Sequence, residues 1–241
     1  MRAIWRLLRL LVHVAGGLWT IHVRFGSLDR AGRLAAIQAW SSRTLVLLGV
    51  ELKCSGLPRP GAKLLLANHV SWLDIAAVHA VMPEARFVAK AGIKHWPLVG
   101  ALVEAAGTLF IERSSKRDAL RVVHQTAEAL KNGDTVAVFP EGTTGPGPEL
   151  LPFHANLLQA AIATETPIQP MMLRWHEPGQ RFSTSARFIG DMTLLQSVWS
   201  IVSARGLGCE LRILLPMESA HADRRALSEH VRELIAEELA R

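Results

Sequence analysis

The first candidates for chemistry are a histidine and an aspartate five residues apart, His69 and Asp74, just after the apolar run 63–67. An imidazole held at one nitrogen by a carboxylate can take a proton at the other, so this pair could act as a general base. Within one regular helix the two side chains would stand about 140° apart and could not meet. They meet only if His69 precedes the helix, with Ser71 as its cap. Because Ser71-x-x-Asp74 is equally a capping box, the pattern alone leaves the role of Asp74 open.

Two further apolar runs also end in polar groups. One runs from Gly107 to Arg113, whose guanidinium is always charged and fits phosphate or carboxylate. The other, over 135–139, is followed by the polar turn Pro140-Glu141-Gly142-Thr143. There the glycine lets backbone approach a ligand, and its neighbours supply hydrogen-bonding groups. Taken alone, a strand that ends in arginine or a polar turn of this kind is common on protein surfaces. Three strands that all deliver such groups to their carboxyl ends predict one shared site.

The elements that must position these residues alternate along the chain after the turn signal 58–61. We expect strands over 63–67, 86–89, 108–111, 135–139, 168–173, 186–189 and 210–215, and helices over 72–81, 115–131, 154–164, 194–204 and 223–240. Such alternation is typical of an α/β domain, which we place over residues 51–241.

The first 50 residues differ from the rest in charge and pattern. They carry seven arginines against one aspartate, whereas the other 191 residues hold 20 basic and 20 acidic side chains. Arg2, Arg6 and Arg9 lie on one stripe of a helix whose other positions are apolar and include Trp5 and Trp19. This pattern favours a helix lying on an anionic membrane surface, and an ordinary helix docked on the domain is the alternative.

A transmembrane anchor is not expected there, because the longest stretch without a charged residue, 10–23, has only 14 residues. A second helix over 31–48 would complete a membrane-associated hairpin, so residues 1–50 form a first unit. The balanced charge of the remainder argues against a nucleic acid partner. Cys54 and Cys209 provide neither a disulfide framework nor a metal site, so a reduced compartment is expected.

Four blocks of the sequence together resemble the glycerolipid acyltransferases related to lysophosphatidic acid acyltransferase. The blocks are Asn68-His69-x-x-x-x-Asp74, Gly107-x-x-Phe110-Ile111-x-Arg113, Phe139-Pro140-Glu141-Gly142-Thr143 and Pro167-Ile168-x-Pro170. The resemblance spans about residues 60–215, and the blocks are specific in combination. It implies an α/β fold with a mixed sheet flanked by helices and preceded by membrane-associated helices. It also implies acyl transfer from acyl carrier protein or coenzyme A to a lysolipid hydroxyl.

The resemblance also implies a role for each matching residue. His69 would be the base that takes the proton from the acceptor hydroxyl, and Asp74 would orient it. Residues that would bind the acceptor are Arg113, Glu141, Gly142, Thr143 and, with less support from its position, Lys90. The thioester is a co-substrate, so neither a cofactor nor a metal is implied. No protein nucleophile is required, because a base alone contributes about 10² to 10⁴-fold.

Departures from the family pattern bear on the acceptor. The residue after Glu-Gly-Thr is often basic in the family and is Thr144 here, and His154 stands where a lysine is common. Lysophosphatidate is the expected acceptor, and lyso-ornithine lipid is the alternative that a Thr-Thr block resembles. A membrane-bound thioesterase or hydrolase and a membrane scaffold without activity are more distant alternatives. We expect a peripheral or monotopic enzyme on the cytoplasmic face of the membrane.

Overall fold

A single mixed β-sheet organises the chain. The computed structural model describes residues 1–111 and 116–241. In these residues the sheet has seven strands in the order β1-β7-β6-β2-β5-β3-β4, and all neighbours are parallel except β6 and β7. The strands are β1 (Glu51–Ser55), β2 (Lys63–Ala67), β3 (Ala85–Lys90), β4 (Leu109–Ile111), β5 (Thr135–Val138), β6 (Ile168–His176) and β7 (Gly208–Ile213). The expected mixed α/β sheet is therefore confirmed.

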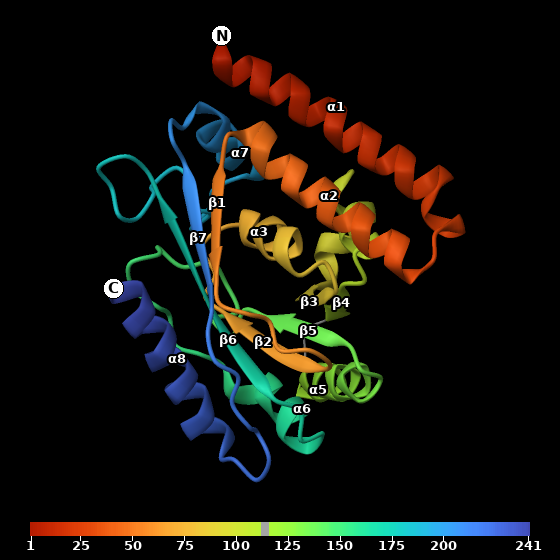
Figure 1. The fold of residues 1–241 in the computed structure, drawn as a ribbon, viewed down its shortest axis with the longest axis vertical. Helices are drawn as coiled ribbons and strands as arrows, with labels where there is room; N and C mark the ends of the chain where they lie inside the picture. Colours follow the sequence, from red (N-terminus) through yellow and green to blue (C-terminus); the bar gives the residue numbers. More distant parts are fainter. Residues whose placement is uncertain (112–115) are drawn as a thin grey trace.

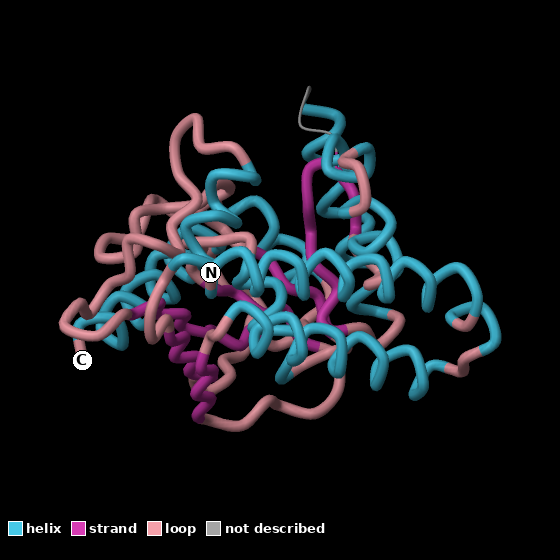
Figure 2. The backbone as a smooth tube through the Cα atoms, turned by 90° about the horizontal axis from the view of Figure 1, so that it is seen from above, coloured by secondary structure: helices cyan, strands magenta, loops and turns pink. Residues whose placement is uncertain are grey.

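Helices cover both faces of this sheet (Figure 1). They are α1 (Arg2–Val23), α2 (Arg30–Leu48), α3 (Leu73–Val81), α4 (Val99–Ala105), α5 (Lys116–Lys131), α6 (Leu158–Ala163), α7 (Leu194–Ser203) and α8 (Arg224–Ala240). One hydrophobic core joins the sheet to α2, α3 and α7, and a second joins it to α5, α6 and α8. Figure 2 shows the helices around the strands in a view turned by 90°.

Strand β2 lies at the centre because its residues are apolar on both faces. Leu65 and Ala67 belong to the first core, whereas Leu64 and Leu66 belong to the second. All four side chains are almost fully buried, and each leucine placed there stabilises the fold by about 2 kcal/mol. A strand buried on both faces reads as a continuous apolar run, which is why the sequence pattern located it.

Helices α1 and α2 form an antiparallel pair that lies along one side of the molecule (Figure 1). The pair can approach closely because Gly17 has no side chain, and a Cβ there would lie 2.5 Å from the Trp40 indole nitrogen. His13 stacks on the same tryptophan ring at 5.0 Å between centroids. Asp29 caps α2 by accepting a hydrogen bond from the Gly32 backbone N–H at 2.8 Å.

The two helices relate differently to the rest of the chain. Helix α2 contributes Leu45 and Leu48 to the first core, whereas α1 exposes many of its large apolar residues, among them Trp5 and Trp19. The inner face of α1 does contact the domain, because Leu10 is buried in the first core and the Arg6 guanidinium donates to the Ala204 carbonyl oxygen at 2.9 Å, at the end of α7. Helix α1 is 22 residues long and apolar enough to span a membrane by length and composition alone, although we expected no spanning helix there.

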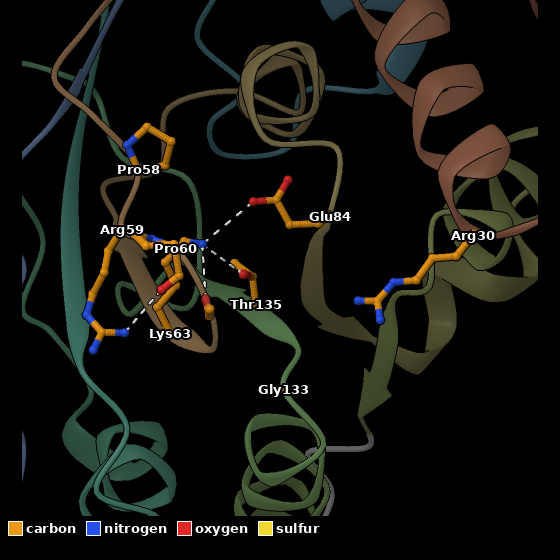
Figure 3. Close-up of a pocket in the computed structure, with 9 residues that line it drawn as sticks. Arg30, Pro58, Arg59, Pro60, Lys63, Glu84, Gly133 and Thr135 are labelled. Atoms are coloured by element: carbon orange, nitrogen blue, oxygen red, sulfur yellow. Dashed lines mark hydrogen bonds and ion pairs between the residues drawn. The ribbon is translucent and has the colours of Figure 1, made fainter.

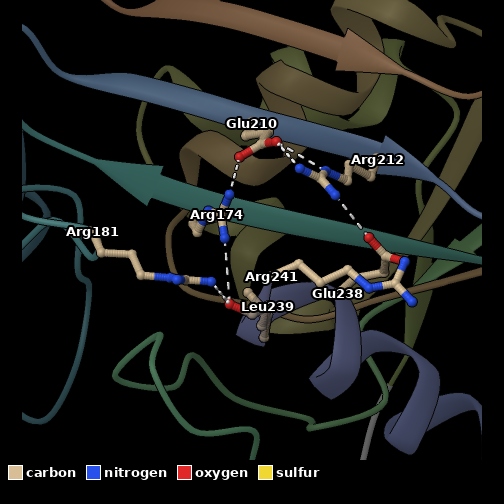
Figure 4. Close-up of polar contacts among 7 residues, drawn as sticks. All are labelled: Arg174, Arg181, Glu210, Arg212, Glu238, Leu239 and Arg241. Carbon is tan, nitrogen blue, oxygen red and sulfur yellow. Dashed lines mark hydrogen bonds and ion pairs between the residues drawn. The ribbon is translucent and has the colours of Figure 1, made fainter.

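Charged contacts hold α8 against the antiparallel pair of strands β6 and β7 (Figure 4). Arg174 on β6 pairs with Glu210 on β7, and Arg212 pairs with Glu238 on α8 at 2.9 Å. The Leu239 carbonyl oxygen at the end of α8 accepts hydrogen bonds from Arg174 at 3.3 Å and from Arg181 at 2.7 Å. Cationic side chains are favourable there because a helix ends in unpaired carbonyl groups.

Three elements differ from the expected ones. The strand expected over 186–189 is wrong, because this segment is irregular and β6 already has β2 and β7 as neighbours. Strand β1 was missed because it is an edge strand with exposed polar residues, and such a strand has no apolar run. Helix α4 was missed because its seven residues are too few for a clear helical period.

Candidate active site

The candidate residues meet at the carboxyl ends of the central strands. Because β2 and β5 are parallel neighbours, the segments that follow them, which begin at Asn68 and Phe139, leave the sheet at the same edge. Asn68 is buried, and its side-chain amide makes two 2.8 Å hydrogen bonds with the backbone of Leu173 on β6. The side chain of Asn68 thus continues the pairing of β2 with β6 and fixes where the next residue begins.

His69 and Asp74 are in direct contact. The His69 Nδ1 atom lies 2.8 Å from Asp74 Oδ2, and this is possible because α3 begins only at Leu73. The Asp74 carboxylate is fully buried. Because a carboxylate only accepts hydrogen bonds, we assign the proton of this hydrogen bond to Nδ1, and Nε2 keeps the lone pair. Within the described residues Nε2 has no hydrogen-bond partner. The geometry is that of an imidazole prepared to accept a proton at Nε2.

Asp74 also organises the backbone around the histidine. Its Oδ2 atom accepts hydrogen bonds from the backbone N–H groups of Val70 at 2.7 Å and Ser71 at 2.9 Å. Its Oδ1 atom accepts one from the Trp175 indole N–H at 2.6 Å. The sequence left two roles open for Asp74, a partner of the histidine and a capping residue of the helix. The structure shows both, because one carboxylate contacts the His69 imidazole and also accepts from backbone N–H groups at the start of the helix. The N-cap residue is Trp72 rather than the expected Ser71, whose hydroxyl accepts from Leu73 N–H at 3.3 Å.

The segment after β5 packs directly on the histidine. The Phe139 ring stacks on the His69 imidazole with centroids 3.9 Å apart, which orients the imidazole plane. Glu141 is buried, and its two carboxyl oxygens accept hydrogen bonds from the His69 backbone N–H at 2.7 Å and the Leu151 backbone N–H at 2.9 Å. Burial raises the pKa of the Glu141 carboxyl, and these two hydrogen bonds partly oppose the shift. Glu141 therefore connects the two loops that border the site.

The other candidate residues lie around this centre. Gly142 has a φ of 71°, in the left-handed region that glycine adopts without strain, and Thr143 beside it is exposed. Lys90 is exposed at the end of β3, in register with Ile111 at the end of β4. Arg113 lies outside the described residues. Asn68 belongs to a motif block but was given no role there, and Trp175 was overlooked. The Asn68 side chain binds the Leu173 backbone and the Trp175 indole binds Asp74, each across more than 100 positions of sequence.

A cationic hollow of about 250 Å³ lies at the opposite edge of the sheet, where β2 and β5 begin (Figure 3). Its central residue, Lys63, is buried, and burial lowers the pKa of its ammonium group. The ammonium donates to the Thr135 hydroxyl at 3.0 Å and pairs with Glu84 at 3.6 Å. Protein groups already satisfy this charge, and the hollow lies at the far end of β2 from His69.

This sheet, with a histidine–aspartate pair at the carboxyl edge of its central strands, places the chain in a known class. The profile of the Acyltransferase family matches residues 52–174, and the chain belongs to this family. The Thermotoga maritima 1-acyl-sn-glycerophosphate (LPA) acyltransferase PlsC has a similar fold, with a TM-score of 0.69 at 22% identity over 98% of this chain and 96% of that one.

Relatives with closer sequences carry two different names. The chain is 38% identical over 190 residues to the 1-acyl-sn-glycerol-3-phosphate acyltransferase of Neisseria gonorrhoeae, which covers 78% of this chain and 73% of the relative. It is 34% identical over 196 residues to the lyso-ornithine lipid O-acyltransferase of Pseudomonas aeruginosa, which covers 81% of this chain and 75% of the relative. The chain is therefore an O-acyltransferase of lipid biosynthesis.

Proposed function

We propose that this enzyme transfers a fatty acyl group from a thioester of acyl carrier protein or coenzyme A to the free hydroxyl of a lysolipid. The observation that carries the proposal is the His69 imidazole, bound to buried Asp74 through Nδ1 and free at Nε2 within the described residues. A base in this state removes the hydroxyl proton as the oxygen attacks. The buried carboxylate stabilises the imidazolium that results.

The proposed reaction balances without a protein nucleophile. The lysolipid oxygen attacks the thioester carbonyl carbon while His69 Nε2 takes the hydroxyl proton. The carbon–sulfur bond then breaks, and the leaving thiolate takes the proton back from the imidazolium. The products are an ester and a free thiol, and His69 is neutral again. Asp74 takes no proton in this scheme, and its two oxygens keep their hydrogen bonds to the Val70 backbone N–H and the Trp175 indole N–H.

For the acceptor we propose 1-acyl-sn-glycerol-3-phosphate, which would give phosphatidic acid. The 38% identity to the Neisseria relative of that name supports this choice. Lyso-ornithine lipid is the second candidate, which the Pseudomonas relative and Thr144 favour. The Thr144 hydroxyl donates to the Phe188 carbonyl oxygen, so this position adds no positive charge to the site. Lys90, Arg113, Gly142 and Thr143 stay proposed acceptor-binding residues.

Glu141 has a different proposed role from these. Both of its carboxyl oxygens accept backbone N–H groups of this chain, at His69 and at Leu151. We therefore assign it to positioning the catalytic histidine. The exposed apolar side chains of α1 support a place for the enzyme at a membrane surface, where the lysolipid would reach the site from the leaflet. We propose that this surface is the cytoplasmic face.

The test is acyl transfer by the purified protein in mixed micelles. Lysophosphatidate and lyso-ornithine lipid are offered in parallel, each with acyl carrier protein and coenzyme A thioesters. We expect transfer to one acceptor, reduced about 10² to 10⁴-fold in His69→Ala and unchanged in His230→Ala, which alters an exposed histidine on α8. Release of free fatty acid without an acylated lipid would indicate a thioesterase. Transfer that survives His69→Ala would refute the assigned base.

A further inference from the structure

An irregular segment, residues 183–188, lies against the catalytic loop from the β6 side. The Ser183 backbone N–H donates to the Trp175 carbonyl oxygen at 2.7 Å, close to the end of β6. The Phe188 backbone N–H donates to the Val70 carbonyl oxygen at 3.0 Å, and the Phe188 carbonyl oxygen accepts from the Thr144 hydroxyl. The segment is therefore joined to β6, to the residue after His69, and to the turn that follows β5.

Further contacts make this segment rigid. Glu177 accepts hydrogen bonds from the hydroxyl groups of Ser183 at 2.5 Å and Ser185 at 3.2 Å. The Ser183 hydroxyl oxygen in turn accepts from the Ala186 backbone N–H at 3.0 Å, and Ala186 is fully buried in the first core. The residue that follows Ala186 is therefore held at a defined place beside the catalytic loop.

That residue is Arg187, whose side chain is half-buried. Its Nε atom is buried and makes no hydrogen bond within the described residues, and no carboxylate of those residues forms an ion pair with its guanidinium. A buried donor nitrogen without a partner is unfavourable, so native proteins keep one mainly where a ligand or a water molecule completes its hydrogen bond. Arg187 is the residue before Phe188 and His69 is the residue before Val70, and the backbones of Phe188 and Val70 are joined by a hydrogen bond.

We propose that Arg187 binds the anionic headgroup of the acceptor lipid, which deepens the proposed function and rests on it. A guanidinium fits the oxygens of a phosphate or a carboxylate, the groups that lysophosphatidate and lyso-ornithine lipid respectively carry. The two carboxyl groups at the site, Asp74 and Glu141, are already bound by protein donors, so neither competes for Arg187.

The position of Arg187 in the fold also differs from that of Lys90. Lys90 ends β3, on one side of β2, whereas Arg187 follows β6, on the other side. Thr144 provides no charge, but its hydroxyl holds the segment that carries Arg187. The turn after β5 thus helps to hold the segment 183–188, which carries the positive charge of Arg187.

The test measures binding and turnover of matched lipids. Binding is measured in the His69→Ala protein, with and without Arg187→Gln, for lysophosphatidate, lyso-ornithine lipid and uncharged monoacylglycerol in neutral micelles. We expect Arg187→Gln to weaken binding of the preferred anionic lysolipid about 10- to 100-fold and to leave monoacylglycerol within about twofold. Arg187→Lys should retain part of the affinity. Arg205→Gln, which alters an exposed arginine after α7, should change neither.

Turnover separates this inference from the proposed function. In the protein with His69 intact, Arg187→Gln should raise the KM for the anionic acceptor and leave the KM for the thioester donor unchanged. Equal losses for charged and uncharged lipids, no loss for either, or a raised donor KM would each overturn the inference. If the wild-type protein transfers no acyl group, the proposed function fails, and the binding comparison still decides the role of Arg187.

Discussion

Replacing Glu141 with glutamine tests whether this residue holds the catalytic loop or contacts the acceptor. The substitution preserves shape, but a glutamine amide has only one acceptor oxygen for the two backbone N–H groups that the carboxyl now accepts, at 2.7 and 2.9 Å. One of these N–H groups would then face the amide NH₂ group without an acceptor. A buried donor left unpaired costs about 1 to 3 kcal/mol.

For a chain of this size, about 2 kcal/mol lowers the melting temperature by about 4 to 8 °C. The His69 backbone would shift by a fraction of an ångström, and small misplacements of a catalytic group cost up to about 10²-fold in rate. We therefore expect Glu141→Gln to lower both the melting temperature and kcat while the KM for the acceptor stays within about twofold. Glu149→Gln, an exposed change in the following loop, is the matched control.

The assay combines thermal unfolding with initial rates at varied acceptor concentration. A variant with unchanged melting temperature and kcat but a strongly raised acceptor KM would refute the reasoning. That result would show that Glu141 touches the substrate rather than the backbone.

Trp175→Phe removes the indole donor to the buried aspartate, so we expect kcat to fall about 10-fold with both KM values unchanged, and unaltered kinetics would contradict a positioning role. Burial lowers the pKa of His79, so the unfolded chain binds more protons below about pH 6.5 and stability falls in acid by up to about 1.4 kcal/mol per pH unit. Denaturant unfolding between pH 5 and 7 should show a flatter dependence in His79→Gln but not in His230→Gln. Reversing the charges of Arg2 and Arg9 should weaken co-sedimentation with anionic liposomes, most strongly at low salt, and equal binding would argue against a membrane-associated α1.

The parts of the fold that could be predicted are those with local signals. Strand β2 is an apolar run buried on both faces, and α2 and α8 begin at aspartate caps, so their patterns sufficed. The run 186–189 has the apolar sequence pattern of a strand, but a strand also needs a neighbouring strand whose hydrogen-bonding edge is unpaired. No window of sequence reports whether the edge of β6 is free.

The candidate site was predictable only to the same extent. The spacing of His69 and Asp74 specified the condition under which they meet, namely that the helix starts after the histidine, and the structure satisfies it. The contribution of Trp175 could not be predicted, because its partner lies 101 residues away and only the path of β6 brings them together. Arg187 was overlooked for the same reason, since its position depends on backbone contacts to Val70.

The core that α2 shares with the sheet limits how this protein can be divided. Leu45 and Leu48 are almost completely buried against residues of β2, α3 and β7. A fragment that begins at residue 51 would therefore expose an apolar surface and aggregate, so the N-terminal hairpin is not a detachable anchor. Helix α3, on which α2 packs, also carries Asp74 in its first turn. A chimaera that exchanges only the hairpin would need to preserve this packed face of α2, while the outward face of α1 could be changed without disturbing the core.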